Sequence, residues 1–152
     1  MKKVLLVVLL ASLVAVIVAC SVASDVALLK TAKTLTDSWL AVYAPLTDTA
    51  KVNALFDAAI TAAGNYQPGK NCANVVATVD AVGAALSAIK SGDPKAQLLI
   101  ATVIASVDLV SSHFANCTPG TLTARHQDTV PNAPATAKEL KARWKALGGP
   151  GK

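Results

Sequence analysis

Apolar residues recur every three or four positions along four segments of this chain. The clearest series is Val75, Val79, Val82, Leu86 and Ile89. This spacing places the side chains on one face of an α-helix, as in the seam of a helical bundle. The alanines between the apolar positions favour helix further, because alanine has the highest helix propensity. The pattern predicts helices over residues 25–43, 48–63, 73–90 and 94–115.

Short polar connections separate these segments. Gly92 is expected to end the third helix, Asp93 to cap the fourth and Pro94 to take its first position. Ser24 and Thr47 are expected to cap the first and second helices. Because short connections make consecutive helices antiparallel neighbours, we expect an all-α, up-and-down four-helix bundle with an additional C-terminal helix. The residues expected in its core include Val52, Phe56, Ile60, Val79, Val82, Leu86, Leu99, Val103 and Val107.

The N-terminus combines a short positive region with an apolar stretch. Lys2 and Lys3 precede residues 4–18, which are almost all apolar. A membrane-spanning helix needs about 20 apolar residues, so this shorter stretch predicts a secretory signal. The stretch ends in Ile17-Val18-Ala19-Cys20. This sequence resembles the lipobox of bacterial lipoproteins.

The resemblance implies that the Cys20 thiol carries diacylglycerol, that a signal peptidase cuts before it, and that the new amine is acylated. Several acyl chains together make a firm membrane anchor. Ser21 stands where an aspartate commonly directs inner-membrane retention in enteric-type bacteria. We therefore expect a lipid-anchored protein of the bacterial cell envelope, at the outer membrane and facing the periplasm. The alternative is an ordinary export signal, with Cys20 as a spare thiol.

The chain divides into four parts on this interpretation. Residues 1–19 are the lipoprotein signal peptide and residues 20–117 form the bundle. Residues 118–135, with several prolines, are a linker. Residues 136–152 form a basic C-terminal helix and a flexible end.

Charge and cysteine content agree with export. The whole chain has 14 Lys and Arg against 9 Asp and Glu, and removal of Lys2 and Lys3 leaves the mature chain at a net charge of +3. This mild excess does not indicate nucleic-acid binding. Cys72 and Cys117 remain after Cys20 is lipidated, and an even pair in an exported protein predicts a disulfide. Both lie about 30–35 Å along their helices from the turn at Gly92. Two free thiols are the alternative.

The sequence contains few residues that could form a catalytic or metal-binding site. Asp108, Ser111, Ser112 and His113 are the residue types of a catalytic triad, but neighbours on a helix point about 100° apart and no nucleophile elbow is present. His126 falls in the linker, and no cluster has metal-ligand spacing. We expect no catalytic site, no metal and no cofactor.

Two apolar helices also contain an aspartate. Asp80 and Asp108 each interrupt a helical stripe. Such a residue faces solvent, pairs with a lysine, or is a buried functional carboxylate.

The last helix is strongly basic. It presents Lys138, Lys141, Arg143 and Lys145 against a single acid, Glu139. These four are the candidate contact residues for an anionic surface. A narrow apolar stripe lies opposite, formed by Leu140, Trp144 and Leu147. The ordinary interpretation is a solvated helix that docks its stripe on the bundle. The proline-bounded linker, the narrow stripe and the local charge support a second hypothesis, in which the helix is a contact element separate from the core.

Two function classes follow. The first is a lipid-anchored interaction or structural module of the cell envelope, contacting an envelope protein or an anionic surface. The alternative is a periplasm-facing binding module for a lipid or other apolar ligand, held between the alanine-rich helices. An enzyme is not expected.

Overall fold

The computed structural model describes residues 2–67, 69–115 and 133–151, with side chains from Val22 onwards. It has five helices and, within the described residues, no strand. The helices are α1 (Lys2–Tyr43), α2 (Thr49–Gly64), α3 (Cys72–Ala88), α4 (Pro94–Ala115) and α5 (Ala137–Ala146). The all-α prediction is confirmed.

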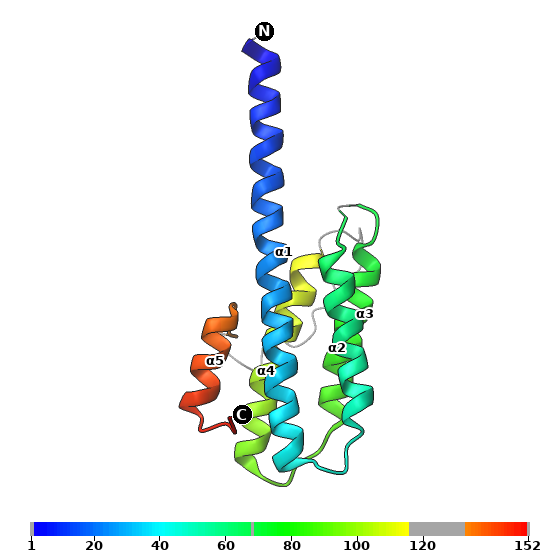
Figure 1. Ribbon diagram of the computed structural model, residues 1–152, viewed down its shortest axis with the longest axis vertical. Coiled ribbons are helices and arrows are strands. Elements are labelled where there is room, and N and C mark those ends of the chain that lie inside the picture. The colour runs from blue at the N-terminus through cyan, green and yellow to red at the C-terminus, as the bar shows by residue number, and fades with distance from the viewer. Residues whose placement is uncertain (1, 68, 116–132, 152) are drawn as a thin grey trace.

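Helices α1–α4 pack as an antiparallel bundle, and α5 lies against α1 and α4 (Figure 1). The first half of α1 extends beyond the other helices. Each of the four bundle helices packs against the next one in the chain, and α1 closes the bundle against α4. The up-and-down arrangement predicted from the short connections is therefore confirmed.

One predicted helix end is wrong. Helix α3 ends at Ala88, with Ile89 as its C-cap, and Gly92 lies in the connection to α4 rather than at the end of α3.

Two predicted helix starts are also wrong. Helix α1 does not begin after Ser24, because no glycine or proline interrupts the chain before it and the helix continues from Lys2. The cap of α2 is Asp48 rather than Thr47: an Asp48 carboxylate oxygen accepts the backbone N–H of Lys51 at 3.1 Å.

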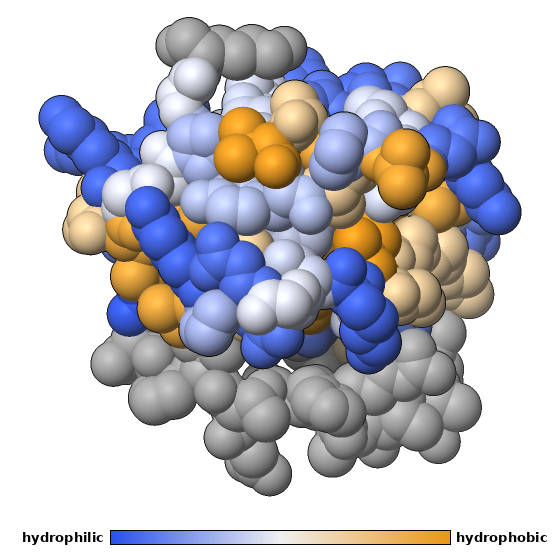
Figure 2. All heavy atoms as spheres, turned by 90° about the horizontal axis from the view of Figure 1, so that it is seen from below, coloured by the Kyte–Doolittle hydropathy of each residue, from blue (hydrophilic) through white to orange (hydrophobic). Residues whose placement is uncertain are grey.

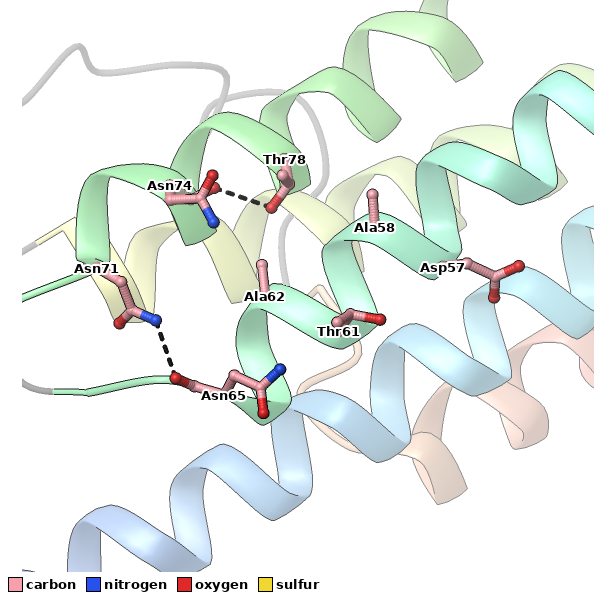
Figure 3. A pocket seen from close by; sticks show the side chains of 8 residues that line it. All are labelled: Asp57, Ala58, Thr61, Ala62, Asn65, Asn71, Asn74 and Thr78. Atoms are coloured by element: carbon pink, nitrogen blue, oxygen red, sulfur yellow. Dashed lines mark hydrogen bonds between the residues drawn. The ribbon is translucent and has the colours of Figure 1, made fainter.

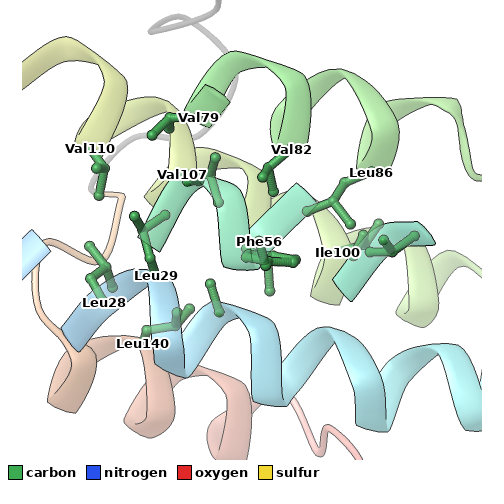
Figure 4. Close-up of a cluster of buried hydrophobic side chains, with 14 of the residues drawn as sticks. Leu28, Leu29, Phe56, Val79, Val82, Leu86, Ile100, Val107, Val110 and Leu140 are labelled. Atoms are coloured by element: carbon green, nitrogen blue, oxygen red, sulfur yellow. The ribbon is translucent and has the colours of Figure 1, made fainter. Parts of the chain in front are cut away.

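The core lies where the four apolar stripes meet (Figure 4). All but one of the residues predicted to be buried are buried. The exception is Ile60, which is half-buried because the inward face of α2 follows Val52, Phe56, Ala59 and Ala63 and leaves Ile60 on its flank. Several fully buried positions are alanines, which let the helix axes approach closely; they are Ala32, Ala59, Ala63 and Ala96.

Helix α1 is tied to the start of α4 by a buried indole. Trp39 is fully buried and donates its Nε1–H to the carbonyl oxygen of Ala96 at 2.9 Å. A buried indole N–H requires such a partner.

Helix α5 is part of the packed structure. Leu140 is fully buried and Trp144 is 4 % exposed, both within the same core cluster as the bundle residues. Figure 4 shows Leu140 close to Leu28 and Leu29 of α1. The hypothesis that this helix is separate from the core is therefore wrong, because its two largest apolar side chains are buried against α1 and α4.

Residues 148–150 of the predicted flexible end contact α5. Gly148 has a φ of 65°, and the Gly149 N–H donates to the Trp144 carbonyl at 2.9 Å. This is the Schellman arrangement that ends many helices. The chain then passes over the indole, whose Nε1–H donates to the Pro150 carbonyl at 3.0 Å. Residue 152 lies outside the described residues.

Helix α4 has a largely buried apolar face. It packs against α1, α3 and α5, and it is the one helix in the searched part of the chain that is long and apolar enough to cross a membrane. A core helix passes the same test, and the inward stripe of α4 is occupied by Leu99, Val103, Val107 and Val110.

Candidate functional site

The predicted site residues lie in different parts of the molecule. Cys20 belongs to α1, in the part whose side chains are not described, and Cys117 and His126 lie outside the described residues. Cys72 is the buried first residue of α3. The side chains of Lys138, Lys141 and Lys145 are exposed along α5, whereas Arg143 is half-buried.

Cys72 lies beside the end of α4. Its Sγ is 3.7 Å from the Tyr66 hydroxyl oxygen, and the Tyr66 ring meets the Phe114 ring edge-on with centroids 4.8 Å apart. The start of α3 and the end of α4 are therefore neighbours, as expected for two antiparallel helices joined by a short turn. The predicted Cys72–Cys117 disulfide stays a prediction, because Cys117 lies outside the described residues.

A buried carboxylate joins the start of the packed part of α1 to the end of α4. Asp25 is 3 % exposed, and its Oδ1 is 2.9 Å from Nδ1 of His113. Burial raises the pKa of the Asp25 carboxyl above its ordinary value of 3.8, while the hydrogen bond and charge of His113 oppose that rise. Sequence reasoning missed this pair because its members are 88 residues apart.

The two serines and the histidine considered as parts of a catalytic triad each bind a different partner. His113 faces α1, and the Ser112 hydroxyl donates to the Leu109 carbonyl at 2.7 Å. Ser111 faces α3, where its hydroxyl donates to the Asp80 carboxylate at 2.7 Å. The arrangement stabilises contacts between helices and does not bring a serine to the histidine.

The two aspartates within apolar stripes both lie between α3 and α4. Asp80 is bound by Ser111, and a Cβ added to Gly83 would lie 3.2 Å from Oδ1 of Asp108. The absence of a side chain at Gly83 therefore leaves room for the second carboxylate. Among the described residues, no three His, Cys, Asp or Glu side chains gather as metal ligands would.

A shallow groove lies between α2 and α3 (Figure 3). Most of its lining side chains are polar: Asp57, Thr61, Asn65, Asn71, Asn74 and Thr78. The Asn71 amide donates to the Asn65 carbonyl at 2.9 Å, which joins the two walls. Ala58 and Ala62 add small apolar groups, but the groove is open, so a lipid chain lying in it would stay largely exposed to solvent.

Comparison of this chain with models of protein families, with curated proteins and with solved structures found no match. The interpretation of its function therefore depends on its own residues. The most informative are residues 17–20 of α1, which resemble a lipobox, the buried Asp25 and the exposed lysines.

Proposed function

We propose that this chain is a lipid-anchored interaction or structural module of the bacterial cell envelope. The lipid is attached to Cys20, and the helical bundle contacts another envelope component. The anchor holds the bundle at the outer membrane, facing the periplasm.

The observation that carries this proposal is that the first half of α1 extends beyond the bundle, whereas its second half packs in it (Figure 1). Val22, two residues after Cys20, packs partly buried against the core, and Asp25 is buried. Cleavage before Cys20 removes the export signal and leaves Leu28, Leu29 and Trp39 in place. Because the first half of α1 extends beyond the other helices (Figure 1), cleavage before Cys20 would remove a protruding segment and leave a short tether to the packed bundle.

The surface chemistry supports a contact role over binding of an apolar ligand. The groove between α2 and α3 is open, so a lipid chain or another apolar ligand lying in it would stay largely exposed to solvent. Exposed lysines are instead numerous, including Lys138, Lys141 and Lys145 on α5. Cationic side chains in this number favour an anionic partner.

Mass spectrometry of the mature N-terminus tests the proposal. The expected N-terminal peptide begins at Cys20 and carries diacylglycerol and an amide-linked acyl chain. Cys20→Ser should accumulate as an unprocessed precursor, whereas the control Cys72→Ser should be processed and acylated normally. An unmodified N-terminus at another residue would contradict the proposal.

Fractionation of the envelope tests the location. The acylated protein should sediment with the outer membrane, and externally added protease should cleave it only after the outer membrane is permeabilised. Recovery with the inner membrane would contradict the outer-membrane assignment and leave the lipid anchor unaffected.

A further inference from the structure

The end of the bundle that lies away from the N-terminal half of α1 carries two of the connections between helices. Because α1–α4 alternate in direction, the connections 44–48 and 89–93 both lie at this far end (Figure 1). The C-terminal segment reaches it as well, since a Cβ added to Gly148 would lie 3.0 Å from Nζ of Lys95. We call the surface formed by Val42, Leu46, Lys51, Lys90, Lys95, Leu98 and Lys145 the distal surface.

The exposed large hydrophobic side chains of the described residues all belong to the distal surface. They are Val42 at 56 % exposed, Leu46 at 100 % and Leu98 at 51 %. Single exposed leucines are common on soluble proteins, but exposed apolar side chains gathered on one end often indicate a contact site. Figure 2 looks at this end and shows hydrophobic side chains standing among hydrophilic ones.

The distal surface is also cationic. Lys51, Lys90, Lys95 and Lys145 are exposed there. The ion pairs within the described part of the chain, Lys33–Asp57 and Asp25–His113, involve none of these lysines.

Two aspartates accompany the lysines at this end. Asp48 accepts the Lys51 N–H at 3.1 Å, and Asp93 accepts the Lys95 N–H at 2.8 Å. Both carboxylates therefore serve as helix caps. The Lys90 ammonium donates to the Ser87 carbonyl at 3.4 Å, and an ammonium group has two further N–H donors for a partner.

We propose that the distal surface docks an acidic segment with exposed apolar residues on another envelope protein. Leu46 and Leu98 would bury against apolar side chains of that segment, and the lysines would pair with its carboxylates. A second copy of this chain is a poor occupant, because two cationic ends would repel each other.

The expectation that the distal surface faces away from the anchoring membrane rests on the proposed function. Helix α4 has 22 residues, so the bundle is about 33 Å long, and the distal surface lies about that far from the end bearing Cys20. A lipid anchor at Cys20 therefore points this surface away from the anchoring membrane and towards other components. The basic side of α5 runs along the flank of the bundle rather than across its membrane end.

Site-specific crosslinking in cells tests the inference on the full-length, lipidated protein. A photoactivatable residue in place of Leu46 should crosslink to one protein, and mass spectrometry should map the crosslink to an acidic segment. The same residue in place of Asn65, which is exposed at the opposite end, should not. Lys90→Glu with Lys95→Glu should reduce the crosslink at least about tenfold.

A matched charge reversal separates local pairing from general electrostatics. Lys30→Glu with Lys70→Glu changes the net charge equally, at exposed positions outside the distal surface, and should leave the crosslink intact. Equal loss in both double variants would overturn the inference. A crosslink to a second copy, to lipid only, or to nothing would overturn it as well.

The acylation state distinguishes this inference from the proposed function. Each crosslinking variant is checked for diacylglycerol on Cys20. An unacylated chain contradicts the proposed function, whereas an acylated chain without the crosslink contradicts only the docking surface. Thermal melts of every variant confirm that the bundle stays folded.

Discussion

Asp25 and His113 form a hydrogen-bonded pair with 2.9 Å between Oδ1 and Nδ1, which joins the first turns of the packed part of α1 to the last turn of α4. The carboxylate is almost completely buried, while the imidazole is 45 % exposed. Burial removes the solvation of a carboxylate, and without a hydrogen-bond donor no interaction compensates for that loss. His113 therefore stabilises the segment that directly follows the proposed lipidation site.

Replacement of His113 should weaken the fold in a pH-dependent way. His113→Ala leaves the Asp25 carboxylate buried without this donor, so the free energy of unfolding at pH 7 should fall by about 1–3 kcal/mol. Because burial raises the pKa of Asp25 in the folded state, the folded protein binds a proton more readily than the unfolded chain. Stability contributed by this group is therefore gained as pH falls through the folded pKa and lost as pH rises through it.

The difference between wild type and His113→Ala should accordingly shrink as the pH falls through the raised pKa of Asp25, because protonation removes the buried charge. Urea unfolding at several pH values measures it. His113→Ala combined with Asp25→Asn is the control and should recover stability at pH 7. A pH-independent loss would show that His113 acts only through packing.

The Trp144 indole requires a glycine at position 149. A Cβ built there would lie 2.3 Å from Nε1 of Trp144, so Gly149→Ala must displace either the indole or the chain end. We expect a loss of about 1–3 kcal/mol and a change in tryptophan fluorescence. Gly151→Ala is the matched control, because a Cβ at that position meets open space. Equal melting temperatures for both variants would contradict the observed packing of residues 148–150.

Truncation of Leu86, a core side chain of α3, should strongly destabilise the fold. Leu86 is 1 % exposed, so Leu86→Ala should reduce the free energy of unfolding by about 2–5 kcal/mol. Leu98→Ala removes the same atoms from a side chain that is 51 % exposed and should cost much less. Chemical denaturation of both variants gives the comparison, and similar losses would contradict the assignment of Leu86 to the core.

The Cys72–Cys117 disulfide should be found by non-reducing peptide mapping of the mature protein. Its loop of about 46 residues would stabilise the fold by roughly 4 kcal/mol through the entropy of the unfolded chain. Replacement of both cysteines by alanine should lower the melting temperature and leave the helical circular dichroism signal largely unchanged, because packing still forms the bundle. Recovery of both thiols unoxidised from freshly isolated envelopes would rule the disulfide out.

The helices of the bundle could be predicted from sequence because the signals that make them are local. The three- and four-residue spacing around Val79 and Leu86 is carried by a single segment, and the Gly92-Asp93-Pro94 turn is formed by adjacent residues. The short connections then left antiparallel packing as the natural arrangement.

The sequence by itself therefore determined the helical class, the order of the bundle and most of its core, since apolar periodicity marks which face must be buried. Only the tertiary structure decided that Leu140 and Trp144 join that core. A narrow apolar stripe is compatible with both a solvated helix and a docked one, and the surface of α1 and α4 on which it docks forms only when the bundle folds. It also paired Asp25 with His113 and left Ile60 on a flank. Contacts between residues distant in sequence depend on the spacing and rotation of whole helices, which no local pattern encodes.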